Sequence, residues 1–498
     1  MKSPRQYQID LVEKARQKLR EIAERLASQG VKRKPRLMIQ LGCGGGKTFL
    51  ASMITQSTID RGGTTQFLVH RDFLLEQTSA TYAEMGISHS YVAAGRWLNQ
   101  WDSAHIGMIG SMKSRMKKIK APKLCFFDEG HHGVAKTWQA IMDAWPDTTF
   151  IFLSATPGAR SDGKGLDAVC DDIVCGPSNA ELIRMGALSD YVYYAPSAPD
   201  LSGLHVRMGE YVVDEIDEEM SKAVIVGDIV QSYTKHAFGT KAIYFATSIK
   251  TSKMYAEAFN SAGIRAEHID ADTSSFDRKR YARMMADGEL DIMTNCGIAT
   301  EGFDLAAQAG KDVTIETVGL CRPTKSLPLL IQMEMRAMRA KPYPGIILDH
   351  GGCYKEHNFL PDDDIEWSLA GGKKSSSGEI KLCDNCGAAI KRFSISCLSC
   401  GAVISEAKQR GKTSGRVDIE HVEGELEKID KDRLRKEKKL EEWHCGSMQE
   451  LQDLAKRRGY KDPLKWAGLI WTSREQRKRA KEYADKQQLD FYQKVGMA

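Results

Sequence analysis

The sequence predicts an α/β protein with two tandem parallel-sheet domains, followed by a small cysteine-rich ribbon and a helical C-terminal module. Three observations support this fold class. Apolar runs of strand length recur between residues 37 and 350 and alternate with helix-like segments. Several runs end abruptly in glycine, acidic or hydroxyl residues, as expected where buried parallel strands deliver polar side chains to the carboxyl edge of a sheet. Two C-x-x-C pairs follow the last apolar run.

The chain of 498 residues is long enough for two or three domains with sizeable cores. Shifts in composition indicate where these domains end. We expect a first parallel-sheet domain at residues 1–190, a polar and irregular connector at 191–224, a second parallel-sheet domain at 225–370, a Gly/Lys/Ser linker and the ribbon at 371–410, a charged helical spacer at 411–442, and a basic helical module at 443–498.

Composition indicates a globular protein of a reducing compartment. Hydrophobic residues make up 42% of the chain and charged residues 28%, which is ordinary for such proteins. No apolar run approaches the roughly 20 residues of a membrane span, so we expect no membrane partner. Most of the 12 cysteines are scattered, which fits the cytoplasm better than a disulfide framework. The net charge of +5 is small and says little about partners.

The first candidate site is a glycine-rich loop, Gly42–Thr48, between the apolar run Leu37–Leu41 and a helix-like segment. Glycines let backbone N–H groups curl around phosphate oxygens, a lysine adds a point charge, and a helix N-terminus adds partial positive charge. The sequence therefore predicts a phosphate cradle, and the alternative is a glycine-rich turn without a ligand. The predicted binding residues are Gly44, Gly45, Gly46, Lys47 and Thr48.

The second candidate site follows the apolar run Leu124–Phe127, which ends in Asp-Glu-Gly-His-His. Asp128, together with Thr48, is expected to hold Mg²⁺ beside the cradle. Glu129 is expected to orient or deprotonate an attacking water. The alternative is a pair of surface acids without a catalytic role.

Apolar runs resume at residues 241–247, 266–270, 291–296 and 345–350, which predicts the second sheet. Between the last two runs, Gln332–Arg339 has a helical pattern. Arg336 and Arg339 are three residues apart, share a face of the expected helix and are expected to reach a phosphate across the interdomain cleft. The alternative is a surface helix with two exposed arginines.

The ribbon carries two C-x-x-C pairs, which come from Cys383, Cys386, Cys397 and Cys400. Two such pairs supply four thiolates in tetrahedral geometry and leave no position for water, so they predict structural Zn²⁺. A redox pair is the weaker alternative, because two pairs would be redundant. The histidines and acids of residues 350–364 could suggest another metal, but a capped loop is the favoured interpretation.

The C-terminal module begins with a capping-box pattern at Ser447–Glu450. Lys456–Lys481 then holds ten basic and two acidic residues, which predicts sequence-independent binding to nucleic acid. The alternatives are a solvated charged face or a docking surface for a protein partner. The ribbon is a second candidate for protein docking.

The motifs, taken in order from Arg5 to Arg339, resemble those of superfamily 2 DExH-box helicases, in particular the XPB-like and restriction-enzyme translocase branch. The chain departs from the family pattern at Leu41 and Met335, where the patterns have glycine. The resemblance implies two RecA-like domains stacked across one ATP with Mg²⁺, and single-stranded nucleic acid crossing both domains.

The resemblance also implies roles for individual residues. Arg5 and Gln8 would contact adenine, and Asp304 would lie near the nucleotide. His131 and Gln332 would join the catalytic set, while Ser154 and Thr156 of the Ser-Ala-Thr motif would couple the ATP state to the grip on nucleic acid through the histidine of the acid motif. The implied nucleic-acid contacts are His70, Arg71, Gln77, Ser111, Thr247 and Thr300.

Taken together, the sequence predicts an ATP-dependent DNA helicase. Three alternatives stay open: a duplex-DNA translocase that does not separate strands, an RNA helicase, and a protein in which ATP only switches the affinity for nucleic acid. The presence of Glu129, Arg336 and Arg339 argues against the last alternative, because a pure binder needs no hydrolytic residues.

Overall fold

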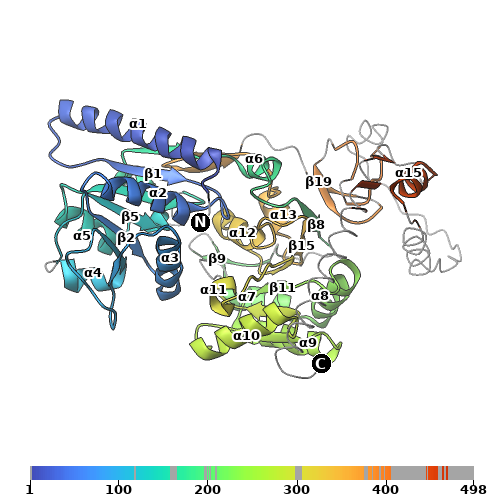
Figure 1. Ribbon diagram of the computed structural model, residues 1–498. Coiled ribbons are helices and arrows are strands. Elements are labelled where there is room, and N and C mark those ends of the chain that lie inside the picture. Colours follow the sequence, from blue (N-terminus) through green and yellow to red (C-terminus); the bar gives the residue numbers. More distant parts are fainter. Residues whose placement is uncertain are drawn as a thin grey trace, which may run out of the picture. The chain divides into compact units, whose positions relative to one another are not determined.

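The computed structural model describes residues 3–116, 119–157, 165–195, 199, 201, 203–207, 210–297, 305–374, 380–383, 385–391, 394–397, 399–404, 445, 447–457, 463–464, 467–468 and 471. The chain divides into two compact units, residues 1–410 and 411–498. The first unit contains two parallel sheets and the cysteine-rich ribbon (Figure 1).

The first sheet has seven strands in the order β3-β4-β2-β5-β6-β1-β7, all paired in parallel. The strands are β1 (Arg36–Gln40), β2 (Thr65–Val69), β3 (Ser90–Val92), β4 (Ala104–Met108), β5 (Leu124–Asp128), β6 (Thr149–Ser154) and β7 (Asp172–Cys175). Every residue of β5 is buried, because helices cover both faces of the sheet. The apolar run that ends in two acids is therefore a central strand, as predicted.

Two groups of helices cover the two faces of this sheet. One core cluster joins the β1 side chains Leu37 and Ile39 to α1 (Gln6–Ser28), α2 (Lys47–Ile59) and α3 (Asp72–Glu84). Figure 1 shows α1 running along this sheet, where it packs against β1 and β7. The other face packs Met38 and Phe127 against α4 (Ile109–Arg115) and α5 (Lys136–Ala144).

The second sheet has six parallel strands in the order β12-β13-β11-β14-β15-β8. The strands are β8 (Tyr191–Tyr194), β11 (Ala242–Ala246), β12 (Ala266–Ile269), β13 (Ile292–Asn295), β14 (Thr317–Cys321) and β15 (Gly345–Asp349). The associated helices are α7 (Val213–Met220), α8 (Ala223–His236), α9 (Ile249–Ser261), α10 (Ser275–Asp287), α11 (Leu305–Ala309), α12 (Leu327–Glu334) and α13 (Cys353–His357). Two parallel-sheet domains are therefore present, as predicted.

Three local predictions are wrong. The connector at residues 191–224 is not irregular, because it contains β8, the hairpin β9 (Val206–Arg207) to β10 (Glu210–Tyr211) and α7. The Tyr-Val-Tyr-Tyr segment of β8 has side chains that favour strands, and it pairs with β15 as the edge of the second sheet. The segment Ile109–Arg115, whose hydroxyl and basic residues are typical of a loop that grips phosphate, is instead the short helix α4. The expected helix Gln332–Arg339 ends at Glu334.

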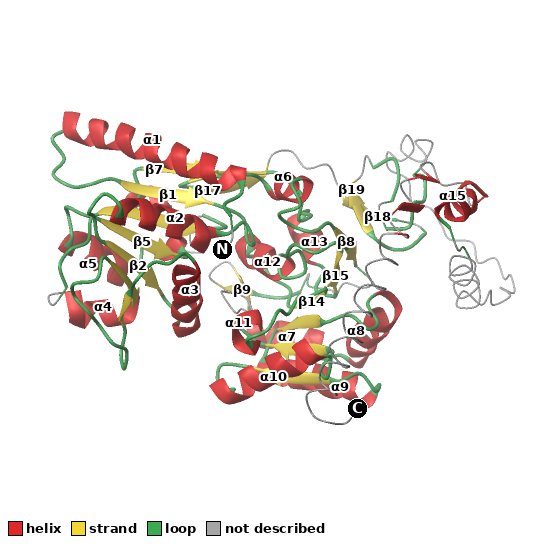
Figure 2. Ribbon diagram, viewed as in Figure 1, coloured by secondary structure: helices red, strands yellow, loops and turns green. Residues whose placement is uncertain are grey.

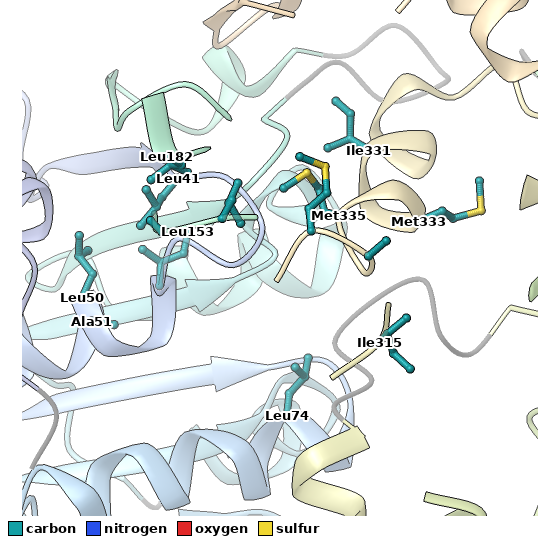
Figure 3. Close-up of a cluster of buried hydrophobic side chains, with 14 of the residues drawn as sticks. Leu41, Leu50, Ala51, Leu74, Leu153, Leu182, Ile315, Ile331, Met333 and Met335 are labelled. Atoms are coloured by element: carbon teal, nitrogen blue, oxygen red, sulfur yellow. The ribbon is translucent and has the colours of Figure 1, made fainter. Parts of the chain in front are cut away.

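The two domains share apolar contacts and two chain connections. One buried cluster includes Leu41, Leu153 and Leu182 from the first domain, and Ile331 and Met335 from the second (Figure 3). The first connection passes from α6 (Asn179–Arg184) into β8, and the Ser189 N–H donates to the Met338 carbonyl over 3.0 Å.

The second connection is the hairpin of β16 (Ile365–Ser368) and β17 (Gly371–Lys374), which follows the second sheet. Its turn returns to the first domain, where the Leu166 N–H donates to the Leu369 carbonyl over 2.7 Å. The Cys175 thiol lies 3.9 Å from the Trp367 carbonyl oxygen. Figure 2 shows β17 beside β7 and β1, which places this hairpin on the first sheet.

In the second unit, helix α15 (Met448–Arg457) packs Leu451 and Leu454 with Cys445 and Ala467. The Glu450 N–H donates to the Ser447 hydroxyl over 3.2 Å, which is the predicted N-terminal cap. Within the described residues, no helix combines the length and the apolar character that crossing a membrane requires.

Candidate active site

The glycine-rich loop turns between β1 and α2 with two residues in the left-handed region. Gly44 has φ 80° and Gly46 has φ 87°, values that side-chain-bearing residues rarely adopt. A Cβ at Gly46 would lie 2.5 Å from Gln8 Nε2, so it would push the Gln8 amide away from the loop. Helix α2 begins at Lys47 directly after the loop, which adds its N-terminal partial charge to the lysine ammonium.

Side chains at the N-terminal end of α1 form hydrogen bonds with the glycine-rich loop. Tyr7 donates its hydroxyl to the Gly45 carbonyl over 2.8 Å, and Gln8 Nε2 donates to the same carbonyl over 3.1 Å. Gln8 Oε1 accepts from the Arg5 N–H over 3.0 Å. Both polar atoms of the Gln8 amide are therefore used within the chain, and it is Arg5 that lines the adjoining cavity.

Two acids end β5 and lie beside the loop. Asp128 is only 6% exposed, and burial, together with repulsion from Glu129, raises the pKa of its carboxyl to about 6. Burial alone would lower the pKa of the Lys47 ammonium, but attraction to Glu129 and Asp128 outweighs burial and raises this pKa. The lysine and the two acids are thus electrostatically coupled at the mouth of the cradle.

Glu129 has a strained backbone, with φ 48° and ψ 50° in the left-handed region. This conformation costs an L-residue about 1 kcal/mol or more. The Oε2 atom of Glu129 is buried, accepts no hydrogen bond from the described residues, and lies 3.5 Å from His131 Nδ1. A buried carboxylate oxygen with spare acceptor capacity is suited to hold a water molecule.

His131 joins the acids to the Ser-Ala-Thr segment. Its Nδ1 lies 3.1 Å from Ser154 Oγ, so the histidine of the acid motif contacts the Ser-Ala-Thr segment directly. Ser154 Oγ also accepts from the Thr156 N–H over 3.1 Å. The Thr156 hydroxyl is buried and has no hydrogen-bond partner among the described residues.

A cavity of about 420 Å³ opens over the cradle, and both domains line it. Its size suits a nucleotide-sized ligand. Phe49, Leu74 and Met335 add apolar surface. The structure gathers these predicted site residues in it: Arg5, Gly44, Gly46, Lys47, Thr48, Gln77, Asp128, Glu129, Gln332, Arg336 and Arg339.

The arginines reach this cavity from tight turns and not from a helix. After α12 ends at Glu334, the N–H groups of residues 336, 337 and 338 donate to carbonyls three residues earlier. Arg339 then forms a β-bridge with Leu188 of the chain that joins the domains. This pairing draws the segment out of helical geometry, which is the physical reason that the helix prediction is wrong there.

Several residues that line the cavity could not be recognised as site residues from the sequence. Ala187 lies where the chain leaves the first domain, and Cys43 fills a variable position of the loop. Thr81 follows Gln77 by four residues on α3, so the two share a helix face. Tyr7, which holds the loop, could have been inferred from its place beside Gln8.

The residues predicted to contact nucleic acid lie in several places. His70 follows β2, and Arg71 is the N-cap residue of α3. Ser111 is half-buried on α4. Thr247 is buried, and its hydroxyl donates to Asp217 over 2.5 Å. Gln77 lines the cavity over the cradle. Thr300 and Asp304 lie outside the described residues.

The four ribbon cysteines converge at one point. Their sulfur atoms all lie within 4.8 Å of one another, and the Cys383–Cys400 and Cys386–Cys397 pairs are 3.8 and 3.6 Å apart. Thiolates around a tetrahedral zinc at ~2.3 Å are separated by about 3.8 Å, so this cluster is compatible with zinc. Burial would raise the pKa of the Cys400 thiol, but hydrogen bonds from Asn385 and the Ala402 N–H lower it to about 7, which favours the thiolate.

The ribbon hairpin of β18 (Ile380–Leu382) and β19 (Ala389–Lys391) packs on β8 of the second sheet. Ala388 forms a β-bridge with Tyr194, whose hydroxyl lies 2.8 Å from Ser399 Oγ. Lys391, a residue near the tip, pairs with Asp362 over 2.9 Å and with Asp363 over 3.1 Å. These acids therefore anchor the ribbon to the second domain.

Two parallel-sheet domains that share one cavity, with a phosphate cradle on one side and arginines on the other, form the architecture of RecA-like ATPases. Residues 1–159 match the family model described as type III restriction enzyme, res subunit. Residues 221–341 match the model described as helicase conserved C-terminal domain. The chain belongs to the superfamily 2 helicases, and it is an ATP-hydrolysing enzyme of that family.

Individual proteins are similar to large parts of this chain. A 51.5 kDa protein of Lactococcus phage (isolate 7-9) is 34% identical over 405 residues, which are 80% of this chain and 83% of that protein. The putative ATP-dependent helicase IRC3 of Saccharomyces cerevisiae is 26% identical over 335 residues, 62% of this chain and 47% of that protein. The solved structure of the ATP-dependent type ISP restriction-modification enzyme LlaBIII bound to DNA shares the fold, with a TM-score of 0.50, 16% identity and coverage of 70% of this chain and 28% of that one.

Proposed function

We propose that this chain is a DNA helicase that couples ATP hydrolysis in the shared cavity to translocation on DNA and separation of its strands. In this proposal residues 1–190 form the first RecA-like domain, and residues 225–370 together with the edge strand β8 form the second. The observation that carries it is the composition of the cavity, where Lys47 and Glu129 of the first domain meet Arg336 and Arg339 of the second. A site divided in this way hydrolyses ATP only while both domains are in place.

The cavity residues fit ATP and Mg²⁺. Gly44 and Gly46 leave the backbone open to phosphate oxygens, and Lys47 supplies the positive charge. Thr48 and Asp128 are the residues that would hold Mg²⁺, which neutralises phosphate charge when bound.

The remaining residues act on water and on the terminal phosphate. Glu129 holds and deprotonates the attacking water through its buried oxygen. Arg336 and Arg339 supply positive charge to the terminal phosphate, and Gln332 lies beside them on the second-domain wall. Their reach depends on the turn after α12, so a change in domain spacing alters the charge around the phosphate.

In this proposal the contact between His131 and Ser154 couples ATP hydrolysis to the binding of nucleic acid. Ser154 is the last residue of β6, and Thr156, two residues later, has a buried hydroxyl without a partner among the described residues, so it is available to take one. His70, Arg71 and Ser111 lie beyond the ends of neighbouring strands and contact the nucleic-acid backbone in this proposal. Thr247 is given no direct contact in this proposal, because its buried hydroxyl donates to Asp217.

Duplex translocation without strand separation is the second candidate function. It is favoured by the match of residues 1–159 to the res-subunit model of type III restriction enzymes, and LlaBIII, which shares the fold, is described as bound to DNA. Both candidates use the same ATPase residues, so only the nucleic-acid product distinguishes them.

The test measures ATP hydrolysis by the full chain with single-stranded DNA, duplex DNA and RNA in parallel. We expect the strongest stimulation by DNA, together with displacement of a labelled strand from a tailed duplex. Displacement of a triplex-forming strand without duplex separation would establish the second candidate instead. Stimulation by RNA alone would contradict both.

A further inference from the structure

The loop between β3 and β4, residues 93–103, holds two tryptophans in solvent. Trp97 is 67% exposed and Trp101 is 85% exposed, although indole is among the side chains that proteins most often cover. The two lie four residues apart in one loop. This pair has no place in the ATPase cavity and needs its own explanation.

Many hydrogen bonds fix the loop. Asn99 exchanges backbone bonds with the Ser90 hydroxyl, 3.1 Å each way, and its carbonyl lies 2.9 Å from His105 Nε2. The Asn99 side chain accepts from the Trp101 N–H over 3.2 Å. The Trp97 carbonyl accepts from the Tyr91 N–H over 3.0 Å. The indoles are thus exposed on an ordered backbone, which lowers the entropy cost of binding a ligand.

The same loop is attached to both segments that we assign to the nucleic-acid backbone. On one side Arg96 hydrogen-bonds Glu76 of α3 and lies 3.9 Å from Asp72, which directly follows Arg71. On the other side Arg115, at the end of α4, donates to the Ala93 carbonyl over 2.7 Å. A strand held by Arg71 and Ser111 would therefore pass this loop.

The charge around the loop also suits a polyanion. Arg96 offsets the negative charge of Glu76 and Asp72 on the α3 side. Arg115 at the end of α4 and Lys120 shortly after it add positive charge on the other side. Exposed aromatic rings beside basic residues are the features with which proteins hold single strands, because every base offers a ring face for stacking.

We propose that Trp97 and Trp101 form a base-stacking platform for a single strand of nucleic acid. The platform rests on the proposed function, because that function brings a strand to α3 and α4. Stacking needs no particular base, so the platform adds affinity without adding sequence preference. Each stacked base contributes a factor on the order of 5 to 100 in affinity.

The test uses the full chain with four changes: Trp97→Ala, Trp101→Ala, the double change, and the double change to phenylalanine. Phe238→Ala is the matched control, because Phe238 is 71% exposed in a turn of the second domain. Fluorescence anisotropy measures binding to oligothymidylate and to an abasic strand of equal length. Thermal unfolding checks that each variant is folded. We expect all of them to fold, because both indoles are exposed and their replacement leaves the core intact.

We expect the double alanine variant to lose about 10-fold or more in affinity for oligothymidylate, with little change for the abasic strand and an unchanged salt slope. The phenylalanine variant should retain most of the affinity. Equal losses on both strands, no loss, or the same loss in Phe238→Ala would overturn the platform. Wild-type protein that binds no strand and shows no stimulated ATPase would overturn the proposed function as well, so the two failures are distinguishable.

Discussion

Replacement of Cys386 by serine, or removal of metal by a chelator, should unfold the ribbon at residues 380–404. The apolar core of the ribbon is small among its described residues: besides the cysteines, Ala388, Ala389 and Ile390 are buried. Their burial is worth about 2–4 kcal/mol. A closed site of four thiolates contributes about 10–16 kcal/mol, so the metal dominates the folding of this segment.

The same change should leave ATP hydrolysis within about 2-fold of wild type, an order-of-magnitude expectation for residues remote from the chemistry. None of the ribbon residues that the structure describes lines the cavity over the cradle. Unfolding of the ribbon should also destabilise strand β8, because Val192 and Tyr194 pack against the ribbon and would become solvent-exposed. Hydrogen exchange should therefore rise in the ribbon and along β8.

Three measurements check this prediction: the zinc content of protein purified without chelator, hydrogen exchange with and without chelator, and ATPase activity. Cys175→Ser is the control, because Cys175 is an exposed cysteine of the first domain. Purified protein without zinc, or a ribbon that keeps its protection after metal removal, would refute the reasoning.

Three further predictions concern the motor and its tail. Lys47→Ala and Glu129→Gln should each lower the stimulated ATP turnover on the order of 10²- to 10⁴-fold. The Glu129→Gln variant should still bind ATP in a nucleotide-binding assay. Arg339→Ala should lower turnover on the order of 10²-fold or more with a smaller loss of ATP affinity, whereas Arg280→Ala, at an arginine outside the cavity, should leave both unchanged. Truncation after Glu442 should preserve basal ATPase and flatten the salt dependence of DNA binding between about 50 and 200 mM salt; an unchanged slope would assign the tail to partner docking.

The strands that carry site residues were predictable because they are buried on both faces. β1, β5 and β6 are continuous apolar runs, so their length and their abrupt polar ends are visible in the sequence. Parallel strands end at one edge, which is why Ser154 could be expected to meet the histidine after β5. This part of the site follows from local sequence alone.

Strand β14 could not be predicted, because Gly319 has the character of a strand breaker. A Cβ at Gly319 would lie 2.0 Å from the ring of Tyr244 on the neighbouring strand. The glycine therefore makes room for a tyrosine more than 70 residues away in the chain. Only the folded arrangement reveals this requirement.

The backbone conformation that positions Arg336 and Arg339 could not be predicted from the sequence either. The helical pattern of residues 332–339 is genuine up to Glu334, but pairing of Arg339 with Leu188 overrides it beyond that point. Gly345 contributes, since a Cβ there would lie 2.1 Å from the Ala337 carbonyl oxygen. Tertiary contacts decide such helix ends, whereas the charges themselves were readable from the residue types.

The hairpin of β16 and β17 limits how the two domains can move. The domains are joined once through Ser189, which bonds Met338, and a second time where the Leu369 carbonyl meets the Leu166 N–H. A body fastened at two separate points keeps one soft degree of freedom, rotation about the line that joins them. We therefore expect rotation of the domains about that line to be easier than sliding of one domain across the other, which would break the hydrogen bond between Leu166 and Leu369.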